Sequence, residues 1–236
     1  MPKKHNKPTG TVGCISIFAD GRPPQFQQVP FPTEKAAIER MVVAAAVSAK
    51  KDLGRFYQLD SDPAQNDEND LDFTLNTSRG EKRLELMEIA FLATGSYDAA
   101  PLSYNHGELA DAICAGIAKK TRRYGDRSSG IHLLLYSTDF RFNVCNDVIW
   151  LVSKWCSATP HAFDSVVYVR FPAPRSVDVK IVHPQPGRDY SKVDEKSVRG
   201  RRTLIGDMTN MKVTPDGRCF SLPLGSPSAR SDDSPA

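Results

Sequence analysis

The 236-residue sequence contains no long hydrophobic run: nothing in it approaches the ~18 consecutive apolar residues of a membrane-spanning helix. The first residues lead into no apolar signal core, so we expect a cytoplasmic protein without a membrane partner. Cysteine is also sparse, because its five copies are scattered, odd in number and form no CxxC pair. This distribution argues against a disulfide framework and against a zinc site.

Several common catalytic motifs are absent as well. The sequence has no G-x-S-x-G elbow, no Walker-type phosphate loop and no H-E-x-x-H helix. Simple serine hydrolases, P-loop NTPases and common zinc peptidases are therefore excluded. The composition, 40% hydrophobic and 25% charged, is that of an ordinary globular domain. A net charge of +3 permits nucleic-acid binding without arguing for it.

What the sequence does contain is a predicted β-hairpin over residues 71–91. Apolar and polar side chains alternate along its first arm, which is the period of a half-buried strand. If Arg79 and Gly80 are the two loop residues, Asp72 pairs with Met87 across the hairpin. The inference depends on this register, because a slip changes which side chains face each other.

Two carboxylates share one face of the predicted hairpin. Asp72 lies on the first arm and Glu85 on the second. Carboxylates converging from neighbouring strands supply the oxygen ligands that a hard cation such as Mg²⁺ prefers. Bound Mg²⁺ can activate water and neutralise a phosphate. The hairpin therefore predicts a metal site formed by Asp72 and Glu85.

The remaining pattern predicts a central sheet covered by helices. Thr33 is expected to cap a helix over 33–49, and Gly125 to end another over 107–124, with a third helix beginning at Asn143 or Asn146. Further strands are expected at 131–136, 166–171 and 177–182. We therefore predict an α/β fold with a central mixed sheet of four to five strands flanked by helices.

The ends of the chain differ in composition from its middle. Residues 1–30 are predicted to form a partly disordered N-terminal arm, and residues 31–183 the α/β domain. From about Pro184 the sequence is rich in proline, glycine, serine and mixed charge, with few apolar clusters. Residues 184–236 are therefore predicted to be a mostly disordered tail.

The element order and the two acidic positions resemble the restriction-endonuclease-like superfamily, whose signature is written PD-(D/E)xK. The resemblance covers residues 33–172, with Asp72 matching the Asp of the motif and Glu85 its next acidic position. Where the motif has Pro this chain has Leu71, and where it has Lys this chain has Met87. The resemblance implies a nuclease-like fold, Mg²⁺ as cofactor and nucleic acid as partner.

Because Met87 stands where the motif has lysine, the resemblance does not determine whether the protein is catalytically active. In the superfamily that lysine lies beside the attacking water and the phosphate, and a thioether provides neither its charge nor its hydrogen bonds. Some members place the lysine elsewhere, which makes Lys119 and Lys120 candidates, although cations near a helix end also complement the helix dipole. Glu39 matches a helical acid of the superfamily, and a solvated helix face explains it about as well.

Two functional hypotheses follow. In the first, the protein is a Mg²⁺-dependent endonuclease that uses Asp72 and Glu85 with a lysine from outside the motif. In the second, the nuclease fold has lost catalysis and serves as a nucleic-acid-binding or protein-interaction module. Elsewhere, His106 is interpreted as part of a polar helix entrance, His132 as a core histidine, and Asp139 as a strand-end site residue or a turn residue.

Overall fold

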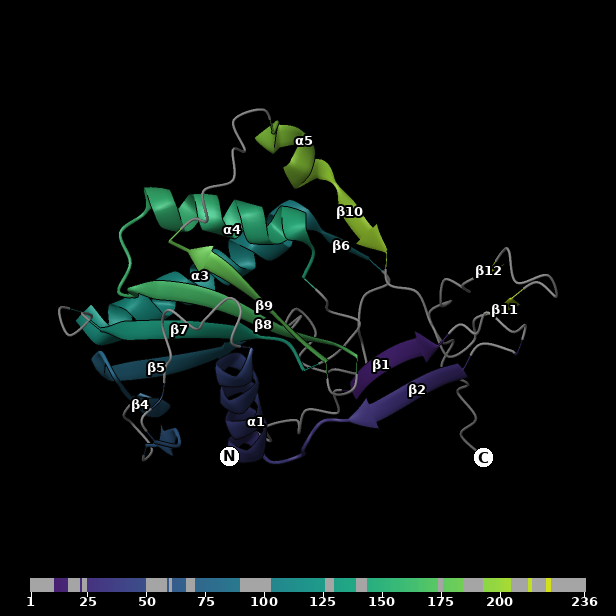
Figure 1. Ribbon diagram of the computed structural model, residues 1–236. Helices are drawn as coiled ribbons and strands as arrows, with labels where there is room; N and C mark the ends of the chain where they lie inside the picture. The colour runs from purple at the N-terminus through teal and green to yellow at the C-terminus, as the bar shows by residue number, and fades with distance from the viewer. Residues whose placement is uncertain are drawn as a thin grey trace, which may run out of the picture.

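The structure is a computed structural model that describes residues 11–16, 22, 25–49, 59, 61–66, 71–89, 103–125, 130–138, 144–173, 176–184, 193–204, 212–213 and 220–221. Its centre is a six-stranded sheet of order β3-β4-β5-β7-β8-β9 (Figure 1). The strands are β3 Ala64–Gln65, β4 Phe73–Thr77, β5 Gly80–Glu88, β7 Ile131–Tyr136, β8 Ser165–Ala173 and β9 Ser176–His183.

The sheet is mixed, as the sequence predicts. Strands β5, β7 and β8 run parallel, whereas the outer pairs are antiparallel. The α/β class is confirmed, and the strand count is six rather than four to five. The additional strand is β3, a two-residue edge strand. It lies in a polar segment without the alternation of apolar and polar residues that would predict a strand.

Helices cover both faces of the sheet. Helix α1, Lys35–Ser48, lies on one face, and α3, His106–Tyr124, lies with α4, Asn146–Ala158, on the other (Figure 1). Every residue of β7 is buried, because Leu134 packs toward α1 while its neighbours Leu133 and Leu135 pack toward α3 and α4. A continuous apolar strand of this kind needs cover on both sides.

The hairpin forms, but in a register that differs from the predicted one. The turn residues are Ser78 and Arg79, with Thr77 paired to Gly80. Gly80 adopts a φ of +93°, and the Thr77 hydroxyl accepts a hydrogen bond from the Arg79 N–H. Moving the turn by one residue shifts every cross-strand pair by two positions. Because side chains alternate between the two faces of the sheet, a shift of two leaves each side chain on the predicted face.

Helix boundaries follow the predictions with one exception. Thr33 does not cap α1: the N-cap is Glu34, and its side chain makes no capping hydrogen bond. Asn105 caps α3 by accepting from the Glu108 N–H, and Gly125 ends that helix with a φ of +50°. Helix α4 starts at Asn146, one of the two alternatives.

Part of the expected tail is ordered against the domain. Within residues 184–236, α5, Glu195–Gly200, is followed by β10, Arg202–Leu204, which pairs antiparallel with β6, Ser103–Asn105. Val198 of α5 is buried in the α3–α4 core, a long-range contact that local composition does not reveal. Most other residues of that segment lie outside the described ranges.

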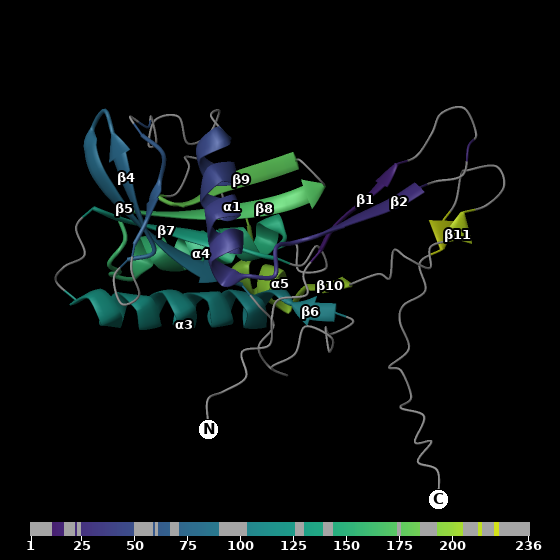
Figure 2. The ribbon, with the colours of Figure 1, turned by 90° about the horizontal axis from the view of Figure 1, so that it is seen from below.

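Two small ribbons complete the described structure. Strands β1, Thr11–Ser16, and β2, Gln25–Pro30, form an antiparallel pair that extends away from the central sheet (Figure 2). Strands β11, Lys212–Val213, and β12, Phe220–Ser221, form the other pair. No helix among the described residues is long and apolar enough to cross a membrane.

Candidate active site

The Asp72 carboxylate is fixed beside Glu85 by the hairpin itself. Asp72 directly precedes β4, and its Oδ2 accepts a 2.7 Å hydrogen bond from the backbone N–H of Leu86. Extending the β4–β5 register by one residue sets Asp72 opposite Glu85. The corrected register therefore brings the two predicted carboxylates closer together than the predicted register would.

Glu85 is the most deeply buried acid of this site. Its side chain is 2% exposed, and Oε1 accepts a hydrogen bond from the Lys120 ammonium. The second oxygen, Oε2, is buried and has no hydrogen-bond partner. A buried carboxylate oxygen without a donor costs free energy, and a cation would remove that cost.

Of the two candidate lysines, the structure brings Lys120 to the site. Lys120 lies on α3, and its side chain is 23% exposed. Lys119 is exposed and, as the preceding helical residue, projects about 100° away around the helix axis. The ion pair between Lys120 and Glu85 therefore places a positive charge next to the acidic hairpin.

Packing accounts for Met87 at the position where the motif has lysine. Met87 and Glu85 share a face of β5, and Met87 packs on the core beneath α3. A Cβ built on Gly116 would come within 2.8 Å of the Met87 sulfur, so the end of the Met87 side chain lies against α3 at Gly116. Gly116 lies about one turn before Lys120 on the same helix.

A third carboxylate, Glu39, comes from α1. It is 6% exposed, and one of its oxygens lies 3.3 Å from the Lys35 ammonium. Burial and then the charge of Asp72 raise the pKa of Glu39, while Lys35 lowers it. Glu39 is thus close enough to Asp72 for the two charges to repel, and its burial rules out the alternative of a solvated helix face.

Asp72 experiences the same repulsion. Burial and then the Glu85 charge raise the pKa of Asp72, while the Leu86 N–H and Lys120 partly offset this rise. The net direction is upward, because burial together with the neighbouring carboxylates outweighs the effect of Lys35 and Lys120. An additional positive charge would stabilise the group.

Sequence reasoning missed two residues of this site. Burial alone would lower the pKa of Lys35, but Glu39, Asp72 and Glu85 outweigh burial and raise it. The Tyr124 hydroxyl is buried beside Glu85, and neither it nor Glu85 Oε2 has a hydrogen bond of full geometry. Burial, then hydrogen bonding to Glu85, raises the phenol pKa, so Tyr124 is a second protein donor close to that carboxylate. The i, i+4 spacing of Lys120 and Tyr124 on one helix was the available signal.

The donor set fits a hard divalent cation. Carboxylate oxygens are the ligands that Mg²⁺ prefers, and Glu85 Oε2 is a buried acceptor without a partner. Among the described residues, no group of three or more His, Cys, Asp or Glu side chains is placed to hold a metal ion. Glu39, Asp72 and Glu85 thus have the chemistry of cation ligands without the spacing of a formed site, and a cation would have to draw them together.

The other sequence candidates lie elsewhere. His132 is 4% exposed, its Nδ1 lies 2.6 Å from the Ser165 hydroxyl, and burial lowers its pKa to about 4, so it is a core histidine. His106 is the first residue of α3, at the predicted helix entrance. Asp139 lies outside the described residues. Comparisons with protein families, curated proteins and solved structures found no match for this chain.

Proposed function

We propose that this chain is a divergent Mg²⁺-dependent nuclease of the PD-(D/E)xK type that acts on nucleic-acid phosphodiesters. The observation that carries the proposal is the Glu85 side chain. One of its buried oxygens pairs with Lys120, and the other is an open acceptor among carboxylates that repel one another. This arrangement supports a site built for a cation with a lysine beside it.

Each residue has a role in this proposal. Asp72 and Glu85 would hold the metal, with Glu39 as a third acidic group from α1. When bound, Mg²⁺ lowers the pKa of water and neutralises phosphate charge. Lys120 supplies a positive charge and hydrogen-bond donors to the negative charge that develops on the phosphate, which is the role the motif lysine has in the superfamily.

The alternative is a catalytically inactive nuclease fold that binds nucleic acid or a protein. Met87 favours this alternative, because a thioether cannot replace the motif lysine. The contact of Lys120 with Glu85 favours the active enzyme, because α3 supplies the cation that β5 lacks. The two hypotheses differ in turnover, which can be measured.

The test is cleavage of labelled single-stranded and duplex DNA and RNA in Mg²⁺ and in EDTA. We expect Mg²⁺-dependent cleavage that falls to background in Asp72→Asn and by about 10²–10³-fold in Lys120→Met. Lys119→Met is the matched control for the lysine, and Asp178→Asn, which alters an acid paired with Arg170 on another strand, is the control for the aspartate. Both controls should retain full activity.

The outcomes separate the two hypotheses. A wild-type protein that cleaves no substrate but binds nucleic acid would support the inactive module. Equal losses in Lys119→Met and Lys120→Met would contradict the role given to Lys120. Cleavage that persists in EDTA would contradict a metal-dependent mechanism.

A further inference from the structure

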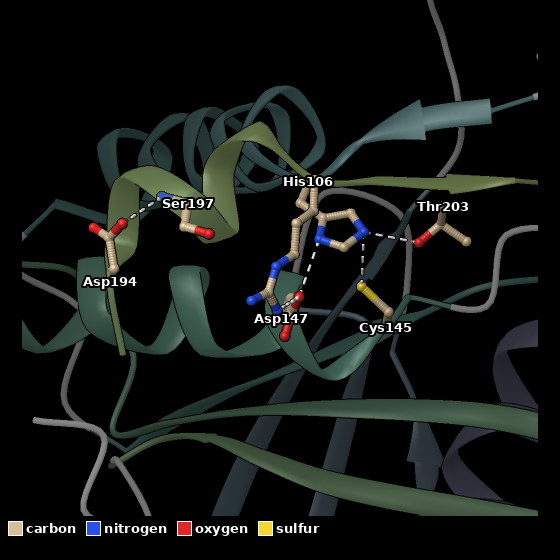
Figure 3. Close-up of polar contacts among 7 residues, drawn as sticks. His106, Cys145, Asp147, Asp194, Ser197 and Thr203 are labelled. Carbon is tan, nitrogen blue, oxygen red and sulfur yellow. Dashed lines mark hydrogen bonds and ion pairs between the residues drawn. The ribbon is translucent and has the colours of Figure 1, made fainter. Parts of the chain in front are cut away.

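A second cluster of reactive side chains lies where the N-termini of α3 and α4 meet β10 (Figure 3). It contains His106 at the start of α3, Cys145 at the N-cap of α4 and Asp147 in the first turn of α4. His106 and Lys120 lie 14 positions apart on α3, which is about 21 Å along the helix axis. The cluster is therefore separate from the proposed nuclease site.

The three side chains are arranged in series. The Cys145 sulfur lies 3.5 Å from His106 Nε2, and His106 Nδ1 lies 3.3 Å from Asp147 Oδ2 (Figure 3). The contact between Nδ1 and Asp147 is at ion-pair distance and does not complete a hydrogen bond, and Cys145 shares Nε2 with the nearer Thr203 hydroxyl. A small movement of the ring toward Asp147 would favour the tautomer with its proton on Nδ1 and leave Nε2 as the base. The order of sulfur, imidazole and carboxylate is that of a nucleophile, its base and the group that orients the base.

Neighbouring groups hold this arrangement in place. The Thr203 hydroxyl of β10 lies 2.8 Å from His106 Nε2, and Arg201 donates a 2.9 Å hydrogen bond to Asp147 Oδ2. The His106 ring is 5% exposed and is therefore fixed between α3, α4 and β10. A base whose position is fixed in this way keeps its distance to the thiol.

Cys145 differs from Cys114 and Cys156. Those two cysteines are buried, and burial raises the pKa of each thiol to about 12, which keeps both protonated. Cys145 is partly exposed and contacts an imidazole. Of these three cysteines, Cys145 alone combines access with a base.

The end of α4 adds hydrogen-bond donors. Cys145 occupies the N-cap without a capping side-chain hydrogen bond, so its side chain satisfies none of the backbone N–H groups of the first turn. These groups belong to the turn that follows Cys145, at the positive end of a 13-residue helix. N–H groups in this position can stabilise an oxyanion that forms beside the sulfur.

We propose that Cys145, His106 and Asp147 form a second site, in which Cys145 accepts an acyl group from an activated ester or thioester. The sulfur attacks the carbonyl carbon, a C–S bond forms, and the thiol proton moves to His106 Nε2. The bond to the leaving alcohol or thiol then breaks, and the leaving group takes that proton. The product is a thioester on Cys145, with no oxidant or reductant involved.

The probe is p-nitrophenyl acetate, added to the intact full-length protein. We expect a burst of one equivalent of p-nitrophenolate per chain, with the acetyl group found on the Cys145 peptide by mass spectrometry. The Cys114 and Cys156 peptides of the same sample are internal controls and should remain unmodified. Acetylation that bypasses Cys145, or no burst, would overturn the proposal.

Variants test the base. His106→Gln should slow Cys145 acetylation about a hundredfold, and His161→Gln, a histidine outside the cluster, should leave the rate unchanged. If His106→Gln does not fold, Asp147→Asn leaves both Cys145 and His106 in place and should slow the step by about tenfold or more. Wild-type rates in the folded variants would also overturn the proposal.

Discussion

Among individual residues, Glu85 and Asp72 determine what the proposed nuclease site can do. Their carboxylates enter a largely buried site in which Lys120 pairs with one oxygen of Glu85 and the Leu86 N–H with one oxygen of Asp72. Burial and then the Glu85 charge raise the pKa of Asp72, so ionisation of this acid is less favourable in the folded state without a metal than in the unfolded chain. The same repulsion that destabilises this state would favour binding of a divalent cation.

This repulsion predicts how the stability of the metal-free protein depends on pH. Between the ordinary Asp pKa of about 3.9 and the raised folded-state pKa, the folded state binds more protons than the unfolded state. Ionised Asp72 therefore lowers the free energy of unfolding at neutral pH, and this loss disappears as the pH falls. Asp72→Asn should be more stable than wild type at pH 7 in EDTA, by a margin that shrinks toward pH 4.

Denaturant unfolding at several pH values measures this margin. Asp178→Asn is the comparison, because it alters an acid that pairs with Arg170 outside the site. The histidines with lowered pKa values are the same in variant and wild type. Their contribution therefore cancels when the free energy of unfolding of wild type is subtracted from that of the variant. A difference that grows as the pH falls would contradict the electrostatic interpretation.

At the scale of elements, the contact between β5 and α3 sets the position of Lys120. Gly116→Ala would place a methyl group 2.8 Å from the Met87 sulfur. The sulfur is near the end of a flexible side chain, so we expect Met87 to shift aside with little movement of α3. The free energy of unfolding should then change by less than about 1 kcal/mol, and cleavage should stay close to that of wild type. Thermal unfolding and the cleavage assay measure the two effects.

One further variant sharpens this test. Gly200→Ala is the matched control, since a Cβ at Gly200 meets nothing within 4 Å. A large loss of cleavage in Gly116→Ala but not in Gly200→Ala would show that Met87 cannot move aside and that α3 shifts instead.

The elements themselves could largely be predicted from the sequence. The β7 boundaries agree with the predicted 131–136, because its side chains are buried on both faces and form one apolar run. Apolar side chains at helical spacing predicted most of α3. The hairpin register was not predictable from alternation alone, because the turn depends on the positive φ of Gly80 and on the Thr77 hydroxyl.

The site was predictable only in part. Asp72 and Glu85 could be paired from strand periodicity, because a register error of two positions leaves both on one face. The choice of Lys120 over Lys119 needed the rotation of α3 about its axis, which depends on packing against Met87. A sequence pattern does not determine that rotation to within one residue.

At the scale of the whole molecule, contacts between distant segments build the second cluster. Arg199 pairs with Asp111 at 2.5 Å, and Arg201 with Asp147 at 2.9 Å, which holds the α5–β10 segment on α3 and α4. These contacts join residues that are far apart in the sequence, and local composition does not reveal such contacts. The composition therefore predicted a disordered tail, whereas residues 193–204 are docked on the domain. The arrangement supplies the Thr203 hydroxyl next to His106.

The most direct test of the central claim is a thermal unfolding titration of the EDTA-treated protein with Mg²⁺ or Mn²⁺. A ligand that binds only the folded state stabilises it by about 2.7 kcal/mol at a hundred times its Kd. We predict a saturable rise in Tm for wild type and for Asp178→Asn, and no rise for Asp72→Asn. A wild-type Tm that does not respond to either metal, or an equal rise in Asp72→Asn, would contradict a metal site formed by Asp72 and Glu85.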